Sequence, residues 1–236
     1  MQIKKYIPNI ITLLNLFCGC IAIIFLTHKD FYLAFLFVSL GIFLDFFDGF
    51  FARLFKVSSP LGLQLDSLAD MVTSGVVPGF AMFILLANFD LNTPELFPYL
   101  GFIVTLGACY RLANFNIDAR QTDSFIGLPT PANALFVLSL PLILQDGSFH
   151  LMTELLSTKW FLMVLVILSA YMMNAEIRLF SLKIKKLNIK DNLLQIIFLS
   201  LSVFLLIAFK FLGVALVILM YVALSIVQNT FLKPAK

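Results

Sequence analysis

Four aspartates dominate the chemistry that this sequence can perform. Asp45 and Asp48 are three residues apart, and Asp66 and Asp70 are four residues apart. Each pair shares one face if its segment is helical, because positions three and four apart are neighbours on a helix. Carboxylate oxygens grouped in this way are hard ligands that suit Mg²⁺ or Mn²⁺. Two ions held among the four aspartates would assist displacement at a phosphorus atom.

The residues between the two pairs fit a phosphate ligand. Gly49 and Gly62 allow a ligand to approach the backbone closely. Ala52 keeps the helix surface low, and Arg53 offers a bidentate donor to a phosphate. The segment 45–70 is therefore a candidate site for metal ions and phosphate.

The elements that carry these residues are expected to be membrane-spanning helices. The chain of 236 residues is 61% hydrophobic and 12% charged, with a mean hydropathy of +1.02. These values exclude an ordinary soluble domain, and the small net charge of +3 gives no support to nucleic-acid binding. The short apolar–polar alternation of a membrane barrel is absent. We therefore expect an all-α, polytopic transmembrane bundle.

Crossing a hydrocarbon core of ~30 Å takes about 20 apolar residues. The sequence offers eight such segments, at 7–26, 31–51, 63–86, 97–115, 131–144, 160–173, 193–208 and 211–227. With eight crossings and a cytoplasmic N-terminus, only Lys29, Lys159 and Lys210 of the 16 lysines and arginines lie on the outer side. This asymmetry follows the positive-inside rule. It predicts one integral membrane domain over 1–236, with both termini and the loop between the aspartate pairs in the cytoplasm.

The stretch from Asp45 to Asp70 reads D-x-x-D-G-x-x-A-R, eight residues, then G-x-x-x-D-x-x-x-D. This pattern resembles the signature of the CDP-alcohol phosphotransferase family, and every fixed position is present. The resemblance implies displacement of CMP from a CDP-linked donor by an alcohol, assisted by two metal ions. It makes Asp70 the base that takes the hydroxyl proton. The implied metal ligands are Asp45, Asp48, Asp66 and Asp70.

The resemblance also implies contacts to the nucleotide lipid. Ser59 matches a position where the family uses a hydroxyl residue near the CDP phosphates, and Asn9 and Thr12 match its nucleotide-facing first helix. The full set of expected donor-binding residues is Asn9, Thr12, Gly49, Ala52, Arg53, Ser59 and Gly62.

Three further stretches, at 8–19, 110–116 and 125–132, resemble the phosphatidylserine synthase branch of the family, and 172–183 is a weaker match. This branch implies CDP-diacylglycerol as the donor and L-serine as the acceptor. It further implies a homodimer, in a bacterial inner membrane, with the active site at the cytoplasmic face.

A zwitterionic acceptor needs a cation for its carboxylate and an acceptor for its ammonium group. Arg111, Asn114 and Arg178 are the candidates for serine binding. Arg111 can equally be a topology anchor at the membrane surface.

Two other functions remain open from the sequence. The acceptor can be glycerol 3-phosphate or inositol phosphate, which would require additional cations for the acceptor's phosphate. Intramembrane carboxylates also form ion sites in transporters, although those sites usually lie near the bilayer midplane on broken helices.

Overall fold

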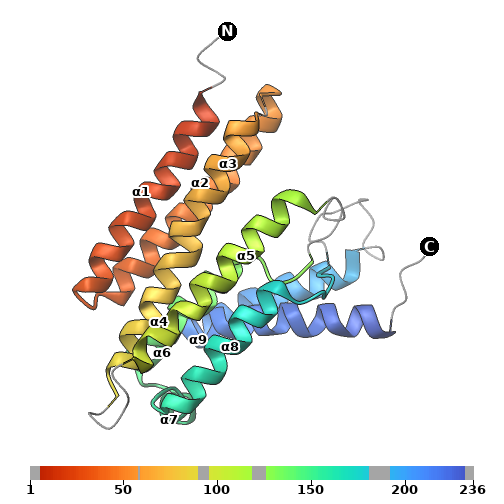
Figure 1. Ribbon diagram of the computed structural model, residues 1–236. Coiled ribbons are helices and arrows are strands. Elements are labelled where there is room, and N and C mark those ends of the chain that lie inside the picture. The colour runs from red at the N-terminus through yellow and green to blue at the C-terminus, as the bar shows by residue number, and fades with distance from the viewer. Residues whose placement is uncertain (1–5, 58, 90–95, 119–125, 181–191, 232–236) are drawn as a thin grey trace.

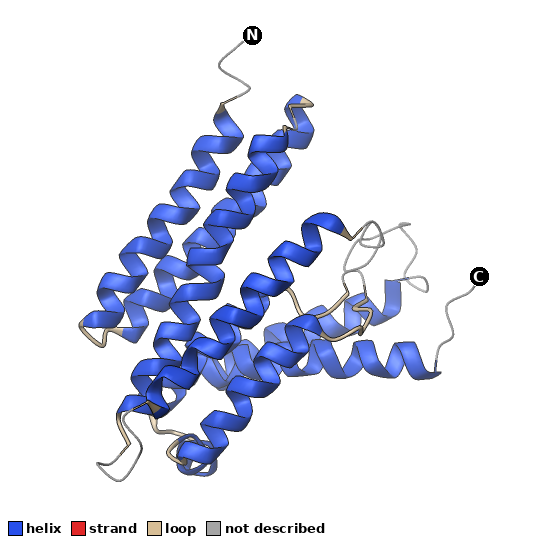
Figure 2. Cartoon of the chain, viewed as in Figure 1, coloured by secondary structure: helices blue, strands red, loops and turns tan. Residues whose placement is uncertain are grey.

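The computed structural model describes residues 6–57, 59–89, 96–118, 126–180 and 192–231. Within these ranges the chain forms helices joined by turns and short loops, with one isolated bridge between Ile126 and Arg178 (Figure 2). The all-α class is confirmed. Many cations of the charge argument lie outside the described residues, namely Lys4, Lys5, Arg120, Lys183, Lys185, Lys186, Lys190, Lys233 and Lys236.

The first two helices form an antiparallel pair along their whole length (Figure 1). Helix α1 spans Ile7–Thr27 and has a proline in its first turn, where no amide donor is required. Helix α2 spans Phe31–Phe55, and the carboxylate of Asp30 caps it by accepting from the Leu33 amide at 3.0 Å. The residue that follows the helix, Lys56, caps its C-terminus with a left-handed backbone conformation.

The third span is continuous but not uniformly α-helical. Helix α3, Pro60–Asp70, is followed by a π-helical turn, η2, over Met71–Val76 and by α4 over Val77–Ala87. Pro78 has no amide hydrogen for the i→i−4 ladder, and the wider turn lies directly before it. The π-turn begins at Met71, so it directly follows the last of the four aspartates, Asp70.

The next part of the chain contains the helix with the most buried residues and the helical segments that precede and follow it. The 3₁₀ segment η3, Phe97–Phe102, leads into α5, Ile103–Ile117, which packs on α8, Lys159–Asn174. Helix α6, Thr130–Asp146, is buried over most of its length because it packs on α2, α4 and α9. A short helix that the sequence did not predict, α7 over His150–Leu156, joins α6 to α8.

Helix α9, Leu193–Phe231, contains a reversal at Lys210, where φ is 48° and ψ is −118°. A Cβ placed on Gly213 would lie 2.3 Å from the Leu205 carbonyl oxygen. Residues eight positions apart on a straight helix are separated by about 12 Å. The two halves of α9 therefore fold back on each other, which separates the seventh and eighth expected segments.

Five described helical stretches are long and apolar enough to cross a membrane, or six when the bent pair α6–α7 counts as one span. Helix α8 is shorter, at 16 residues, and the reversal at Lys210 divides α9 into two arms. The chain is thus a polytopic membrane protein. In Figure 1 the start of α1, the α2–α3 turn and the ends of α5 and α8 lie toward the top and right, whereas the α1–α2 turn and α7 lie at the lower left.

Candidate active site

The four aspartates face one another across the α2–α3 hairpin. Asp45 and Asp48 lie 10 and 7 residues before the end of α2, whereas Asp66 and Asp70 lie 6 and 10 residues after the start of α3. At 1.5 Å per residue, Asp48 and Asp66 are about 10 Å from the hairpin turn, and Asp45 and Asp70 about 15 Å. Helix α2 continues to Phe55, beyond the expected end at residue 51, so the carboxylates lie deeper than the sequence predicted.

Three of these carboxylates form a compact group. Oxygens of Asp45, Asp48 and Asp66 lie within 4.8 Å of one another, and Asp45 Oδ1 is buried with no hydrogen-bond partner in the part of the chain that the structure describes. Like charges held this close are unfavourable unless a cation lies between them. The oxygen donors and the unpartnered Asp45 atom therefore fit a hard divalent cation. Asp70 faces the same cavity but is outside this compact group.

Helix α1 supports one carboxylate of each pair. The Thr12 hydroxyl is within hydrogen-bond distance of Asp48 Oδ2 and of the Pro8 carbonyl. One turn further, Asn15 Nδ2 donates to Asp70 Oδ1 at 3.2 Å. Thr12, which the resemblance assigned to the nucleotide, thus also contacts an aspartate.

The aspartates line a cavity of about 390 Å³, which we call the carboxylate cavity. Its other lining side chains include two cations and several apolar groups. The full lining is Asp45, Phe46, Asp48, Gly49, Arg53, Asp66, Ser67, Asp70, Arg111, Leu112, Phe115, Pro129, Thr130 and Pro131.

A second cavity, of about 220 Å³, adjoins the first between α1 and the α2–α3 turn; we call it the Asn9 cavity. The two share Asp48, Gly49 and Asp66. Six of the seven expected donor-binding residues line it: Asn9, Thr12, Gly49, Ala52, Ser59 and Gly62. The seventh, Arg53, lines the carboxylate cavity. Ser59 has a structural role besides, because its hydroxyl caps α3 by accepting from the Gly62 amide at 3.0 Å.

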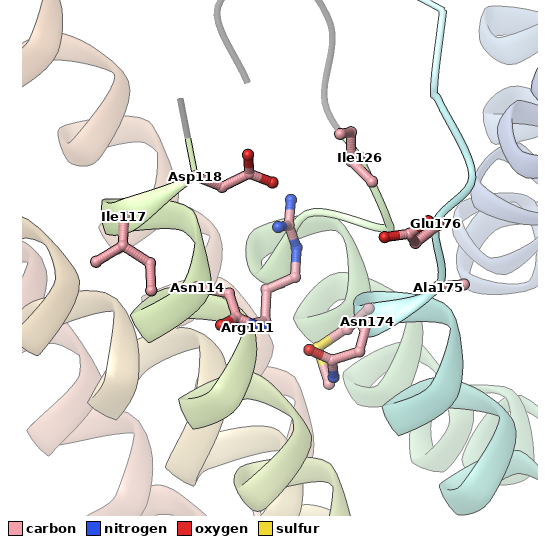
Figure 3. Close-up of a pocket in the computed structure, with 9 residues that line it drawn as sticks. Arg111, Asn114, Ile117, Asp118, Ile126, Asn174, Ala175 and Glu176 are labelled. Carbon is pink, nitrogen blue, oxygen red and sulfur yellow. The ribbon is translucent and has the colours of Figure 1, made fainter. Parts of the chain in front are cut away.

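A third cavity, of about 340 Å³, lies on the other side of Arg111, and we call it the Arg111 cavity (Figure 3). Arg111 lines both this space and the carboxylate cavity. Figure 3 shows its guanidinium group extending between Asp118 and Glu176. The remaining lining residues are Asn114, Ile117, Ile126, Met173, Asn174 and Ala175.

Arg111 is 5% exposed, so its side chain does not extend to the membrane surface as an anchor would. Its Nε donates to the Leu128 carbonyl at 3.0 Å, and the ring of Phe115 lies 5.7 Å from its guanidinium carbon. The same turn is tied to the other side of the cavity, because the Gly127 amide donates to the Ile177 carbonyl at 2.9 Å. Arg111 therefore fixes the wall that separates the two cavities.

The three candidates for serine binding are not all brought together. Arg111 and Asn114 line the Arg111 cavity. Arg178 is exposed and lines none of the three cavities, and its carbonyl accepts from Asn229 Nδ2 at 2.6 Å.

Sequence reasoning did not assign several residues of the site. Asn15 shares a helix face with Thr12 at i, i+3 and lies in the stretch 8–19 that resembles the branch, but neither signal gave it a role. Asp118, Asn174 and Glu176 reach the Arg111 cavity from the ends of two helices that are distant in sequence. Asn174 and Glu176 lie in the weakly matching stretch 172–183, which assigned them no role, and no local pattern marks Asp118.

The chain belongs to the CDP-alcohol phosphatidyltransferase family, whose pattern matches residues 5–172. The family's enzymes are membrane proteins, in agreement with the helical bundle and its aspartate hairpin.

Individual relatives narrow the comparison. The chain is 38% identical over 153 residues to a CDP-diacylglycerol–serine O-phosphatidyltransferase of Bacillus subtilis. The aligned region covers 61% of this chain and 82% of that protein. It is 36% identical over 200 residues to the enzyme of the same name from Helicobacter pylori, covering 82% and 80%. A Saccharomyces cerevisiae enzyme of that name is 36% identical over 165 residues, covering 62% and 57%.

Proposed function

We propose that this protein is a phosphatidylserine synthase, which transfers the phosphatidyl group of CDP-diacylglycerol to the hydroxyl of L-serine and releases CMP. The observation that carries the proposal is the series of three adjoining cavities: the Asn9 cavity, the carboxylate cavity and the Arg111 cavity. They provide separate space for a nucleotide, for the reacting phosphate and for a small charged acceptor. Relatives of the same name support the choice of donor and acceptor.

In this assignment the donor's nucleotide occupies the Asn9 cavity and Arg53 binds a donor phosphate. Asp45, Asp48, Asp66 and Asp70 hold Mg²⁺ or Mn²⁺, with two ions as the expected number. Bound divalent ions would supply the positive charge that stabilises the attacking and leaving oxygens. Asp70 takes the proton from the serine hydroxyl. The serine oxygen then forms a bond to the phosphorus of the phosphatidyl group, and the bond from that phosphorus to CMP breaks.

The acceptor belongs in the Arg111 cavity in this proposal. Arg111 and Asn114 bind the serine carboxylate, and the carboxylates of Asp118 and Glu176 provide negative charge for the ammonium group. Among the residues that the structure describes, this cavity is lined by one arginine and two carboxylates, a balance of charge that suits a zwitterion better than a phosphate-bearing acceptor. Serine is therefore favoured over glycerol 3-phosphate and inositol phosphate.

The cellular setting is part of the same proposal. The chain is expected to form one domain, to assemble as a homodimer and to lie in a bacterial inner membrane with the aspartate hairpin at the cytoplasmic face. No described feature favours ion transport, because the carboxylates adjoin spaces suited to a nucleotide and an amino acid.

The decisive experiment measures CMP release from CDP-diacylglycerol by the purified protein in mixed micelles with Mn²⁺. Serine, glycerol 3-phosphate, inositol phosphate and no acceptor are compared, and Asp70→Asn is the inactive control. We expect release to depend on serine and to fall ~10² to 10⁴-fold in Asp70→Asn, as is usual when a general base is removed. Transfer to glycerol 3-phosphate in preference to serine would overturn the proposal.

A further inference from the structure

Asn15 contacts Asp70, the proposed base, from a helix outside the aspartate hairpin. It is 0% exposed in the middle of α1, and its Nδ2 donates to Asp70 Oδ1 at 3.2 Å. The orientation of the amide is fixed by this partner, since the reverse orientation would place two acceptor oxygens against each other.

The contact determines which oxygen of Asp70 is available. An amide nitrogen can only donate, so Asn15 occupies Asp70 Oδ1 through a lone pair. The other oxygen, Oδ2, remains for the carboxylate cavity that Asp70 lines. Asn15 therefore restricts rotation of the carboxylate without adding charge to the aspartate group.

Close packing holds Asn15 in this position. A Cβ on Gly41 of α2 would lie 2.7 Å from Asn15 Oδ1, so no larger residue fits at position 41. The Thr73 hydroxyl donates to the Asn15 carbonyl at 3.1 Å. Thr73 belongs to the π-turn that follows Asp70. The side chain of Asn15 thus bonds the last residue of α3, and its backbone bonds the turn directly after it.

Packing alone does not require an amide at this position. Asn15 Oδ1 is buried without a partner among the described residues, which is unfavourable for a polar atom. A leucine of similar size would fill the space without that cost. What the amide contributes is the hydrogen bond to Asp70.

We propose that Asn15 is a positioning residue that orients Asp70 so that Oδ2 faces the acceptor hydroxyl. The inference rests on the proposed function, because it assigns Asp70 the proton-accepting role. It extends the carboxylate machinery to α1, which also supports Asp48 through Thr12.

The test compares Asn15→Leu with Asn133→Leu. Asn133 is also 0% exposed, and it accepts a side-chain hydrogen bond from Ser169 at 2.7 Å. Its Nδ2 has no partner among the described residues, and it lines none of the three cavities. The two substitutions remove equivalent buried amides. Melting temperatures should fall by similar amounts in both variants. Only Asn15→Leu should lower kcat for CMP release, by ~10 to 100-fold as expected for a misplaced catalytic group, with the KM for CDP-diacylglycerol within threefold of wild type.

A second readout needs no activity. In metal-free buffer, the changes in melting temperature caused by Asn15→Leu and Asp70→Ala should be non-additive, because both remove the same bond. The changes caused by Asn133→Leu and Asp70→Ala should add. Additive changes for the first pair, or a kcat of Asn15→Leu within threefold of wild type, would overturn the positioning role. If wild type uses another alcohol in place of serine, the acceptor proposal fails, and the same comparison with that alcohol still decides the role of Asn15.

Discussion

At the scale of single residues, the main energetic feature is a group of acidic side chains in an apolar bundle. Asp45, Asp48 and Asp66 repel one another at the distances that the structure gives, and Asp45 Oδ1 is buried without a hydrogen-bond partner among the described residues. A bound cation reverses the sign of this interaction. Stability and metal binding should therefore change together when one carboxylate is removed.

We expect Asp45→Asn to raise the melting temperature of the metal-free protein, because it removes one of three mutually repelling charges at nearly constant size. The rise that Mn²⁺ produces in wild type should shrink, and CMP release should fall by at least ~10²-fold. Asp146→Asn is the control, since Asp146 lies outside the three cavities and pairs with the exposed Lys210 at 3.9 Å. The metal assignment fails if Mn²⁺ stabilises Asp45→Asn as much as wild type. Circular-dichroism melting with and without Mn²⁺ gives the comparison.

A second residue-scale prediction separates the two candidate arginines. Arg111→Gln should raise the KM for serine by ~10 to 100-fold, the range expected for loss of a charge-assisted hydrogen bond, and should change the KM for CDP-diacylglycerol much less. Arg178→Gln should leave both values within about threefold, because Arg178 lines none of the cavities. A larger serine effect in Arg178→Gln would transfer the carboxylate-binding role to that residue. Both are measured from initial rates in mixed micelles.

At the scale of the elements, hydropathy predicted where helices lie better than where they end. Helix α2 continues past the apolar run through Arg53 to Phe55, because helical hydrogen bonding does not stop where the side chains become polar. The π-turn after Asp70 and the short α7 have no hydropathy signal. The contact between Asn15 and Asp70 joins residues 55 positions apart, so it depends on how α1 packs and not on a local motif.

Gly49 of α2 gives a prediction in which stability and function diverge. A Cβ at this position would meet nothing closer than 3.8 Å, and it would enter space shared by the carboxylate and Asn9 cavities. Gly49→Ala should therefore increase stability by up to about 1 kcal/mol, the gain in helix propensity, while raising the KM for CDP-diacylglycerol.

The matched control is Gly41→Ala, whose Cβ would lie 2.7 Å from Asn15 Oδ1 and should lower the melting temperature. An unchanged KM for CDP-diacylglycerol in Gly49→Ala would show that no donor group occupies the space next to Gly49. Both variants add one methyl group to α2, at positions eight residues apart: position 41 is tightly packed, whereas position 49 borders the cavities.

The reversal in α9 places Lys210 in a backbone conformation that glycine adopts more readily, with φ of 48°. We expect Lys210→Gly to stabilise the protein by about 1 kcal/mol, or roughly 2 to 4 °C in melting temperature. The lost contact to Asp146 costs little, because the lysine side chain is 73% exposed. Lys210→Ala loses the same contact but keeps its Cβ, so it should show no gain. A melting temperature of Lys210→Gly no higher than that of Lys210→Ala would contradict this account of the turn.

At the scale of the whole molecule, the charge asymmetry predicts the orientation in the membrane. In a variant whose native cysteines are replaced by serine, an impermeant thiol reagent added to intact cells should label His28→Cys and should not label Ile117→Cys. His28 lies in the α1–α2 turn. Ile117 is the last residue of α5, at the other end of the bundle (Figure 1), and is 81% exposed. The reverse pattern would place the aspartate hairpin on the outer side. Labelling of both positions after permeabilisation confirms that each is reactive.

The order of the three cavities also bears on how product and substrate compete. The Asn9 cavity and the Arg111 cavity have no lining residue in common, and each adjoins the carboxylate cavity from a different side. If the proposed assignment of the cavities holds, a departing nucleotide and an arriving amino acid do not compete for the same space. CMP should inhibit competitively against CDP-diacylglycerol but not against serine. Double-reciprocal plots of the initial rate against one substrate, at several fixed concentrations of the other, should give intersecting lines. Intersecting lines are expected when both substrates are bound before the phosphatidyl group is transferred.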